Sequence, residues 1–186
     1  MELTGGTVCS GIAAGAFALA AVTDLARRRI ANPLVGLAAT AWVVSALLGG
    51  LGQGVLGIDA PGALGAGGWP AAGAALATGL AAFLTMLACY RFGWVGGGDV
   101  KLAAVTLLWA GPALAPAALT VIALSGLILT LTMLATRPLR RRAGGPAVLR
   151  PLLVALDDRR GVPYGVPLAL GGLAVTLPPW LGLLKG

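Results

Sequence analysis

The sequence contains no histidine, and it is poor in charged side chains. Lys, Arg, Asp and Glu together make up 10% of the 186 residues, and only six residues are acidic. A soluble domain usually carries about a quarter charged residues, so this composition excludes an ordinary soluble fold. Aromatic residues are also few, at 5%, and no basic patch interleaves with them as single-strand binding requires. We therefore expect no nucleic-acid partner.

Cysteine is nearly absent as well. The two cysteines, Cys9 and Cys89, each lie in an apolar run, and they form no C-x-x-C pair. Without histidine or paired cysteines, the usual zinc ligand sets do not assemble. Both thiols are expected to pack between helices as small apolar side chains, and neither a metal nor a cofactor is expected.

The sequence is instead rich in apolar residues, which make up 58% of it. Most of the apolar stretches have about the twenty residues that a helix needs to cross a bilayer, and the alternation typical of a membrane barrel is absent. We therefore expect an all-α membrane protein in which residues 1–186 form a single domain. Six spans are predicted: 4–23, 33–51, 70–90, 100–111, 115–136 and 163–184.

Basic residues predict the orientation of these spans. The N-terminal "MELTGG" has no basic residue, unlike a cleaved signal peptide, which indicates a first span with its N-terminus outside. Six alternating spans then place the loops 24–32, 91–99 and 137–162 on the cytoplasmic side. Together with Lys101, these loops hold twelve of the thirteen basic residues, as the positive-inside rule predicts. The last of them is a long basic loop before the final helix.

The fourth span is short for a membrane crossing. Its twelve residues cover only ~18 Å, and Pro112 and Pro116 follow it, which favours a turn or a kink. Either the helix continues past Pro112, or it begins below the membrane surface. A small-xxx-small pattern at Gly11–Gly15 in the first span favours close helix packing.

Four of the six acids have ordinary explanations. Glu2 and Asp59 fall outside, near a terminus and in a glycine-rich loop, and Asp157 and Asp158 neighbour two arginines. The other two, Asp24 and Asp99, lie at the ends of spans on the same predicted face, where an ionisable residue is a candidate functional site.

Each of these two aspartates also has a purely structural explanation. Asp24 can pair with Arg27 or Arg28 on its own helix face, and Asp99 can act as the N-cap of its helix. A cap does not explain the three glycines Gly96, Gly97 and Gly98 before Asp99, which let another chain approach closely. Two aspartates held together can share a proton, so that one acts as acid and the other as base in amide hydrolysis. Helix dipoles favour Asp99 as the anion.

Three segments resemble the type IV prepilin peptidases, which belong to the G-x-G-D intramembrane aspartyl proteases. "GGGDVKLAA" (96–104) resembles their G-x-G-D-x-K-L segment, "DLARRRIANPL" (24–34) their first aspartate segment, and "VPYGVPLALGG" (162–172) their P-Y-G segment. The resemblance implies a catalytic pair of Asp24 and Asp99, with Gly96, Gly97, Gly98, Lys101 and Asn32 shaping the site. Lys101, two residues beyond Asp99, is expected to position rather than to react, at the lipid headgroups.

This resemblance also implies a substrate and a location. Such an enzyme removes the basic leader from prepilins or pseudopilins at the cytoplasmic face of the bacterial inner membrane. Larger members carry an N-terminal zinc-binding insertion linked to methylation of the trimmed pilin. No such insertion is present here, so the sequence resembles the short, peptidase-only forms of Flp (Tad) pilus systems, and methyltransferase activity is not expected. The family's I-P-N reads Ile30-Ala31-Asn32 here, with Pro33 following.

Two other functions remain open on sequence alone. A small helical bundle with acids at the membrane edge is also compatible with a proton-coupled carrier that relays protons through Asp24 and Asp99. A non-catalytic subunit of a pilus or secretion assembly is the other alternative. The oligomeric state is not indicated.

Overall fold

The computed structural model describes residues 5–51, 68–141 and 162–177, and all of its regular secondary structure there is helical. The helices are α1 (Gly5–Arg27), α2 (Asn32–Leu51), α3 (Gly68–Arg91), α4 (Gly97–Arg141) and α6 (Gly165–Thr176). The prediction of an all-α protein is therefore confirmed for the described residues.

Four of these helices are long and apolar enough to cross a membrane, namely α1, α2, α3 and α4, and α6 is a shorter apolar helix. A helix satisfies its own backbone hydrogen bonds, which a segment surrounded by lipid must do. The protein is thus a membrane protein. A count of six spans, and their orientation, stay predictions. The predicted inside loop 137–162 is corrected at its start, since α4 is helical through Arg141; residues 142–161 lie outside the described part of the chain.

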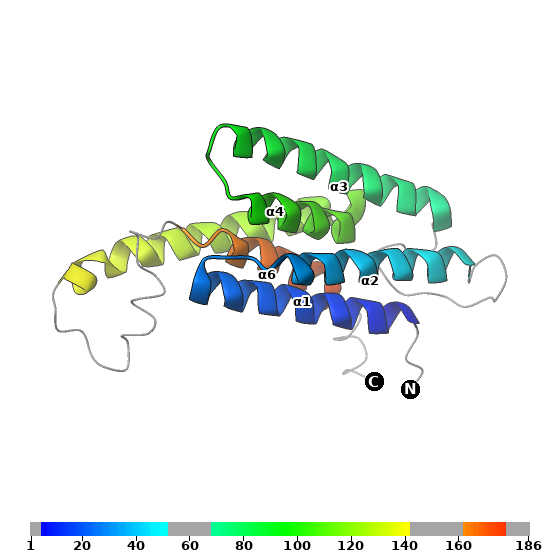
Figure 1. The fold of residues 1–186 in the computed structure, drawn as a ribbon, viewed down its shortest axis with the longest axis horizontal. Helices are drawn as coiled ribbons and strands as arrows, with labels where there is room; N and C mark the ends of the chain where they lie inside the picture. The colour runs from blue at the N-terminus through cyan, green and yellow to red at the C-terminus, as the bar shows by residue number, and fades with distance from the viewer. Residues whose placement is uncertain (1–4, 52–67, 142–161, 178–186) are drawn as a thin grey trace.

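Helix α4 consists of two segments divided at Gly111. This residue has φ 57° and ψ −176°, a left-handed φ that glycine adopts without the steric cost of a Cβ. The first segment runs alongside α3, and beyond Gly111 the chain turns back and runs in the opposite direction (Figure 1). The alternative in which the helix continues straight past Pro112 is therefore wrong. Proline is well placed here, because the first position of a helix needs no N–H donor.

The short helix α6 lies at the centre of the bundle. It packs against α1 on one side and α4 on the other, while α2 covers α1, and α3 covers α4 (Figure 1). One end of the bundle contains the end of α1, the start of α4 and the start of α6. This arrangement brings three segments that are far apart in the sequence to one place.

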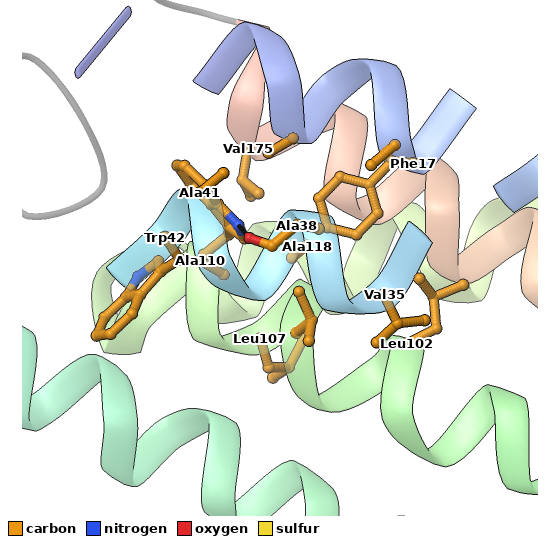
Figure 2. Packing of buried hydrophobic residues seen from close by; sticks show 14 of the residues in the cluster. Phe17, Val35, Ala38, Ala41, Trp42, Leu102, Leu107, Ala110, Ala118 and Val175 are labelled. Atoms are coloured by element: carbon orange, nitrogen blue, oxygen red, sulfur yellow. Dashed lines mark hydrogen bonds between the residues drawn. The ribbon is translucent and has the colours of Figure 1, made fainter. Parts of the chain in front are cut away.

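Small residues let these helices approach each other closely. A Cβ at Gly172 of α6 would lie 2.6 Å from the ring of Phe17, and one at Gly171 would lie 2.5 Å from Ile122. Phe17 is fully buried, in a core to which α1, α2, α4 and α6 contribute (Figure 2). The small-xxx-small pattern at Gly11–Gly15 is predicted to favour close packing. At Gly15, however, a Cβ would meet no atom within 4 Å. The closest contacts of this kind are made by α6, and Gly5 of α1 and Gly79 of α3 make others with Leu48 and Leu108.

A buried hydrogen bond ties the first segment of α4 to α2. The indole Nε1–H of Trp109, a residue with 1% exposure, donates to the backbone carbonyl of Ala38 at 3.0 Å. Trp109→Phe is expected to cost about 1 kcal/mol, the usual net value of one such bond, and to lower the melting temperature in detergent by a few degrees. Trp94→Phe is the matched control, because Trp94 is 72% exposed. Equal melting temperatures for the two variants would contradict this assignment.

Candidate active site

Asp24 is a buried residue in the last turn of α1, just before the connection to α2. The helix ends at Arg27, and Arg28 adopts a left-handed φ of 54°, a conformation that glycine usually supplies just after a helix. The backbone N–H of Arg28 donates to the carbonyl of Asp24 at 2.9 Å, and its guanidinium interacts electrostatically with the Asp24 carboxylate. Arg28 is therefore the arginine that interacts with Asp24, although it lies beyond the last helical residue and not on the helix face predicted for this pairing.

Asp24 is nearly enclosed, with 6% of its surface exposed. The backbone N–H groups of Gly165 and Val166, at the start of α6, are within hydrogen-bonding reach of its carboxylate. Its Oδ2 is buried and has no hydrogen-bond partner among the described residues. A buried polar atom normally has a partner, and an exception calls for an explanation such as a catalytic role.

Gly165 makes the closest approach to this carboxylate. A Cβ built on Gly165 would lie 2.8 Å from both Cγ and Oδ2 of Asp24, and 2.9 Å from Cδ1 of Ile30. Any larger residue would have to displace one of these groups. The start of α6 thus reaches Asp24 only because residue 165 has no side chain.

Asp99 lies in the first turn of α4 and faces back along the chain. Its Oδ2 accepts a hydrogen bond from the backbone N–H of Gly96 at 3.1 Å. Helix α4 begins at Gly97, so Asp99 is its third residue and Gly96 occupies the cap position. The predicted N-cap role is therefore corrected: Asp99 occupies the third position, from which an acidic side chain reaches back to the capping N–H.

The three glycines before Asp99 do three different things. Gly96 is exposed and supplies the N–H that holds Asp99, while Gly97 is exposed and a Cβ added to it would lie 3.7 Å from the ring of Tyr90. Gly98 is packed, because a Cβ added to it would lie 3.2 Å from Cβ of Ile30. Clearance for a substrate backbone stays a hypothesis for the two exposed glycines, whereas Gly98 accommodates a side chain of the protein itself.

The two aspartates meet although 74 residues separate them in the sequence. Asp24 comes from the end of α1 and Asp99 from the start of α4, and the carboxylates are close enough for their charges to interact. Asp99 is half-buried, so the pair combines an enclosed carboxylate with a more accessible one. Like charges at short range do not both ionise easily, and such a pair is suited to hold a single proton.

Lys101 and Asn32, both predicted to shape the site, contact each other. The Lys101 Nζ donates to Oδ1 of Asn32 at 3.2 Å, which joins the first turn of α4 to the first residue of α2. Both side chains are exposed. The predicted positioning role of Lys101 thus has a definite partner within the protein.

Removing this contact is expected to have a modest effect. Lys101→Met keeps the length of the side chain but not the donor, and activity should fall by no more than about 10-fold, as expected for an exposed interaction worth about 1 kcal/mol. Asn32→Ala should have a similar effect, and the double variant should be no worse than either single one. Additive losses in initial cleavage rates would show that the two residues act separately.

Sequence reasoning did not single out Ile30 or Gly165 as site residues. Both belong to segments that carry the family resemblance, but their importance lies in contacts between those segments. Among the described residues, no group of three or more His, Cys, Asp or Glu side chains is placed to hold a metal ion.

Comparison with protein families identifies the family of this chain. The model of the type IV leader peptidase family matches residues 11–131, more than half of the chain and a range that includes both aspartates. The chain belongs to the type IV leader peptidase family. Comparisons with curated proteins and with solved structures give no match. Family membership implies a peptidase, hence a hydrolase, with a prepilin substrate in a membrane context. Helix α6 lies beyond the matched range.

Proposed function

We propose that this member of the type IV leader peptidase family is a membrane-embedded aspartic endopeptidase, with Asp24 and Asp99 as its catalytic pair. The observation that carries the proposal is the meeting of these two carboxylates at the ends of α1 and α4. Family membership supports the reaction, leader removal, and the pair supports the aspartic mechanism. Gly96, Gly97, Gly98, Lys101 and Asn32 hold and shape the pair.

The chemistry needs one ionised and one protonated carboxyl group. The carboxylate takes a proton from a water molecule as its oxygen attacks the scissile carbonyl carbon, and the carboxylic acid protonates the carbonyl oxygen. The gem-diol intermediate then collapses: one of its hydroxyl groups gives a proton to the carboxylate that is now ionised, the C–N bond breaks, and the leaving nitrogen takes up the proton of the other carboxyl group, which restores the starting state of the pair. The titration steps belong to the pair rather than to either residue.

The distribution of charge supports a site on the cytoplasmic side. Besides the half-buried Arg28, four exposed basic residues lie at this end of the bundle: Arg27, Arg29, Arg91 and Lys101. The opposite ends of α1, α2 and α3 carry no charged residue in the described ranges. Basic residues gather on the cytoplasmic side of membrane proteins, which is where the basic leader of a prepilin lies.

We propose the short, peptidase-only activity, directed at Flp-like prepilins or pseudopilins. The cysteine pairs that a zinc-binding insertion needs do not occur in the sequence, and Cys9 and Cys89 lie in different helices, α1 and α3. Trimming of the leader without methylation of the new N-terminus is the activity that this sequence supports.

Co-expression with an Flp-like prepilin in a host without its own prepilin peptidase tests the proposal. We expect the pilin to be shortened by its leader, with mass spectrometry locating one cut and an unmethylated N-terminus. Cleavage by the purified protein should persist in EDTA and N-ethylmaleimide, because carboxylates and water carry the reaction. A precursor that stays full length would instead favour the carrier or the non-catalytic subunit.

A further inference from the structure

Ile30 lies between two glycines of the candidate active site. It belongs to the short connection between α1 and α2, and it is half-buried against the core. A Cβ at Gly98 of α4 would lie 3.2 Å from Ile30 Cβ, and a Cβ at Gly165 of α6 would lie 2.9 Å from Ile30 Cδ1. One side chain therefore contacts the first turns of two different helices.

We propose that Ile30 is a positioning residue that fixes Asp99, and the start of α6, relative to Asp24. It is six residues beyond Asp24 and contacts Gly98, the residue directly before Asp99. On the other side it contacts Gly165, which is packed against the Asp24 carboxylate. The consequence for catalysis rests on the proposed aspartic function, whereas the positioning itself does not.

The chemistry of isoleucine suits this role. Its β-branch leaves few rotamers, so the side chain is stiff at χ1; Cβ faces Gly98 of α4, and Cδ1 lies close to both Gly98 and Gly165 of α6. Each facing residue is a glycine, which brings the helix backbone against the branch. A wedge of this kind sets a distance, because tightly packed side chains resist compression.

Catalysis by a pair of carboxylates is sensitive to such a distance. A misplacement of about 1 Å costs reactions of this kind about 100-fold. Because Asp24 and Asp99 are carried by separate helices, their separation depends on what lies between those helices. Ile30 is expected to act on turnover and not on substrate binding, since its contacts are with the protein.

Cross-linking tests the positioning without reference to activity. In a Cys9→Ala, Cys89→Ala background, Asp24→Cys and Asp99→Cys are introduced, and a short bifunctional methanethiosulfonate reagent joins the two thiols in membranes. Ile30→Ala should lower the cross-linking yield several-fold and favour longer reagents. Ile12→Ala is the matched control, because Ile12 is 43% exposed on α1 and far from the site in sequence. An unchanged yield in Ile30→Ala would overturn the inference.

Cleavage kinetics test the consequence. Ile30→Ala should lower kcat by about 10- to 100-fold with KM unchanged, and Ile30→Val, which keeps Cβ but loses Cδ1, should lie between it and the wild type. The structure also predicts a specific rescue. The three atoms nearest to an added methyl at Gly98 all belong to Ile30, so adding Ile30→Ala should restore part of the activity of Gly98→Ala, whereas Gly165→Ala also meets Asp24 and should not be restored.

The two readouts separate the two proposals. A changed cross-link with normal cleavage keeps Ile30 as a positioning residue and refutes the aspartic pair. An unchanged cross-link refutes the role of Ile30, whatever the kinetics. Equal rescue of both glycine variants, or of neither, would also count against the wedge. Ile30→Val provides the same comparisons if Ile30→Ala fails to accumulate in membranes.

Discussion

Asp24→Asn and Asp99→Asn are each expected to abolish leader removal, with a loss of at least about 1,000-fold in kcat/KM, within the range that general acid–base catalysis supplies. Asparagine has nearly the size of aspartate, but it neither takes a proton from water nor gives one to the substrate. Because the two residues act as a unit, the double variant should be no less active than either single variant.

The assay for this prediction is initial cleavage of a purified prepilin, with each variant quantified in membranes. Asp59→Asn is the matched control, since the sequence predicts Asp59 on the opposite side of the membrane. It lies outside the described residues. Full activity in either Asp24→Asn or Asp99→Asn would refute the aspartic mechanism while leaving family membership in place.

Glutamate at the same positions should distinguish the two carboxylates. Asp24 is 6% exposed and packed against Gly165, so one added methylene has no room. Asp99 is half-buried and held by a single backbone N–H, which can follow a small movement. We therefore expect Asp99→Glu to retain measurable cleavage and Asp24→Glu to retain none above the background of Asp24→Asn. The reverse order would show that accessibility does not govern the tolerance of the pair.

Scarcity of charge made the aspartates predictable from sequence. In a chain with six acids, the two at the ends of apolar spans stood out, and helix lengths with basic loops placed them on one face. The break near Pro112 was also foreseeable, because proline disfavours a continuous helix. Composition, span length and motif therefore indicate the apolar helices and the two aspartates that the structure brings together.

The contacts that hold the pair were not predictable in this way. The sequence has thirty glycines, and nothing local distinguishes Gly165, which is packed on Asp24, from Gly15, which has open space around it. Ile30 resembles any apolar residue near a span. Its role depends on two helices that begin at residues 97 and 165, and this kind of information lies in tertiary packing rather than in local pattern.

Gly165→Ala is expected to lower leader cleavage by about 100-fold or more, the cost of a misplacement of about 1 Å, while leaving the fold intact. The added methyl would lie 2.8 Å from the Asp24 carboxylate and 2.9 Å from Ile30 Cδ1. The Asp24 carboxylate and Ile30 Cδ1 are both at the ends of side chains, so they can move at lower cost than the backbone.

The Asp24 carboxylate, which moves at low cost, is also the reacting group. The substitution should therefore lower activity strongly while it changes stability little. Gly165→Ala should melt within a few degrees of the wild type in detergent, yet show a lowered kcat. Gly73→Ala, in α3 with open space around its Cβ position, is the matched control and should keep full activity. If Gly165→Ala unfolds the protein, the contact with Asp24 is mainly structural. If it cleaves normally, the carboxylate does not need the position at which α6 holds it.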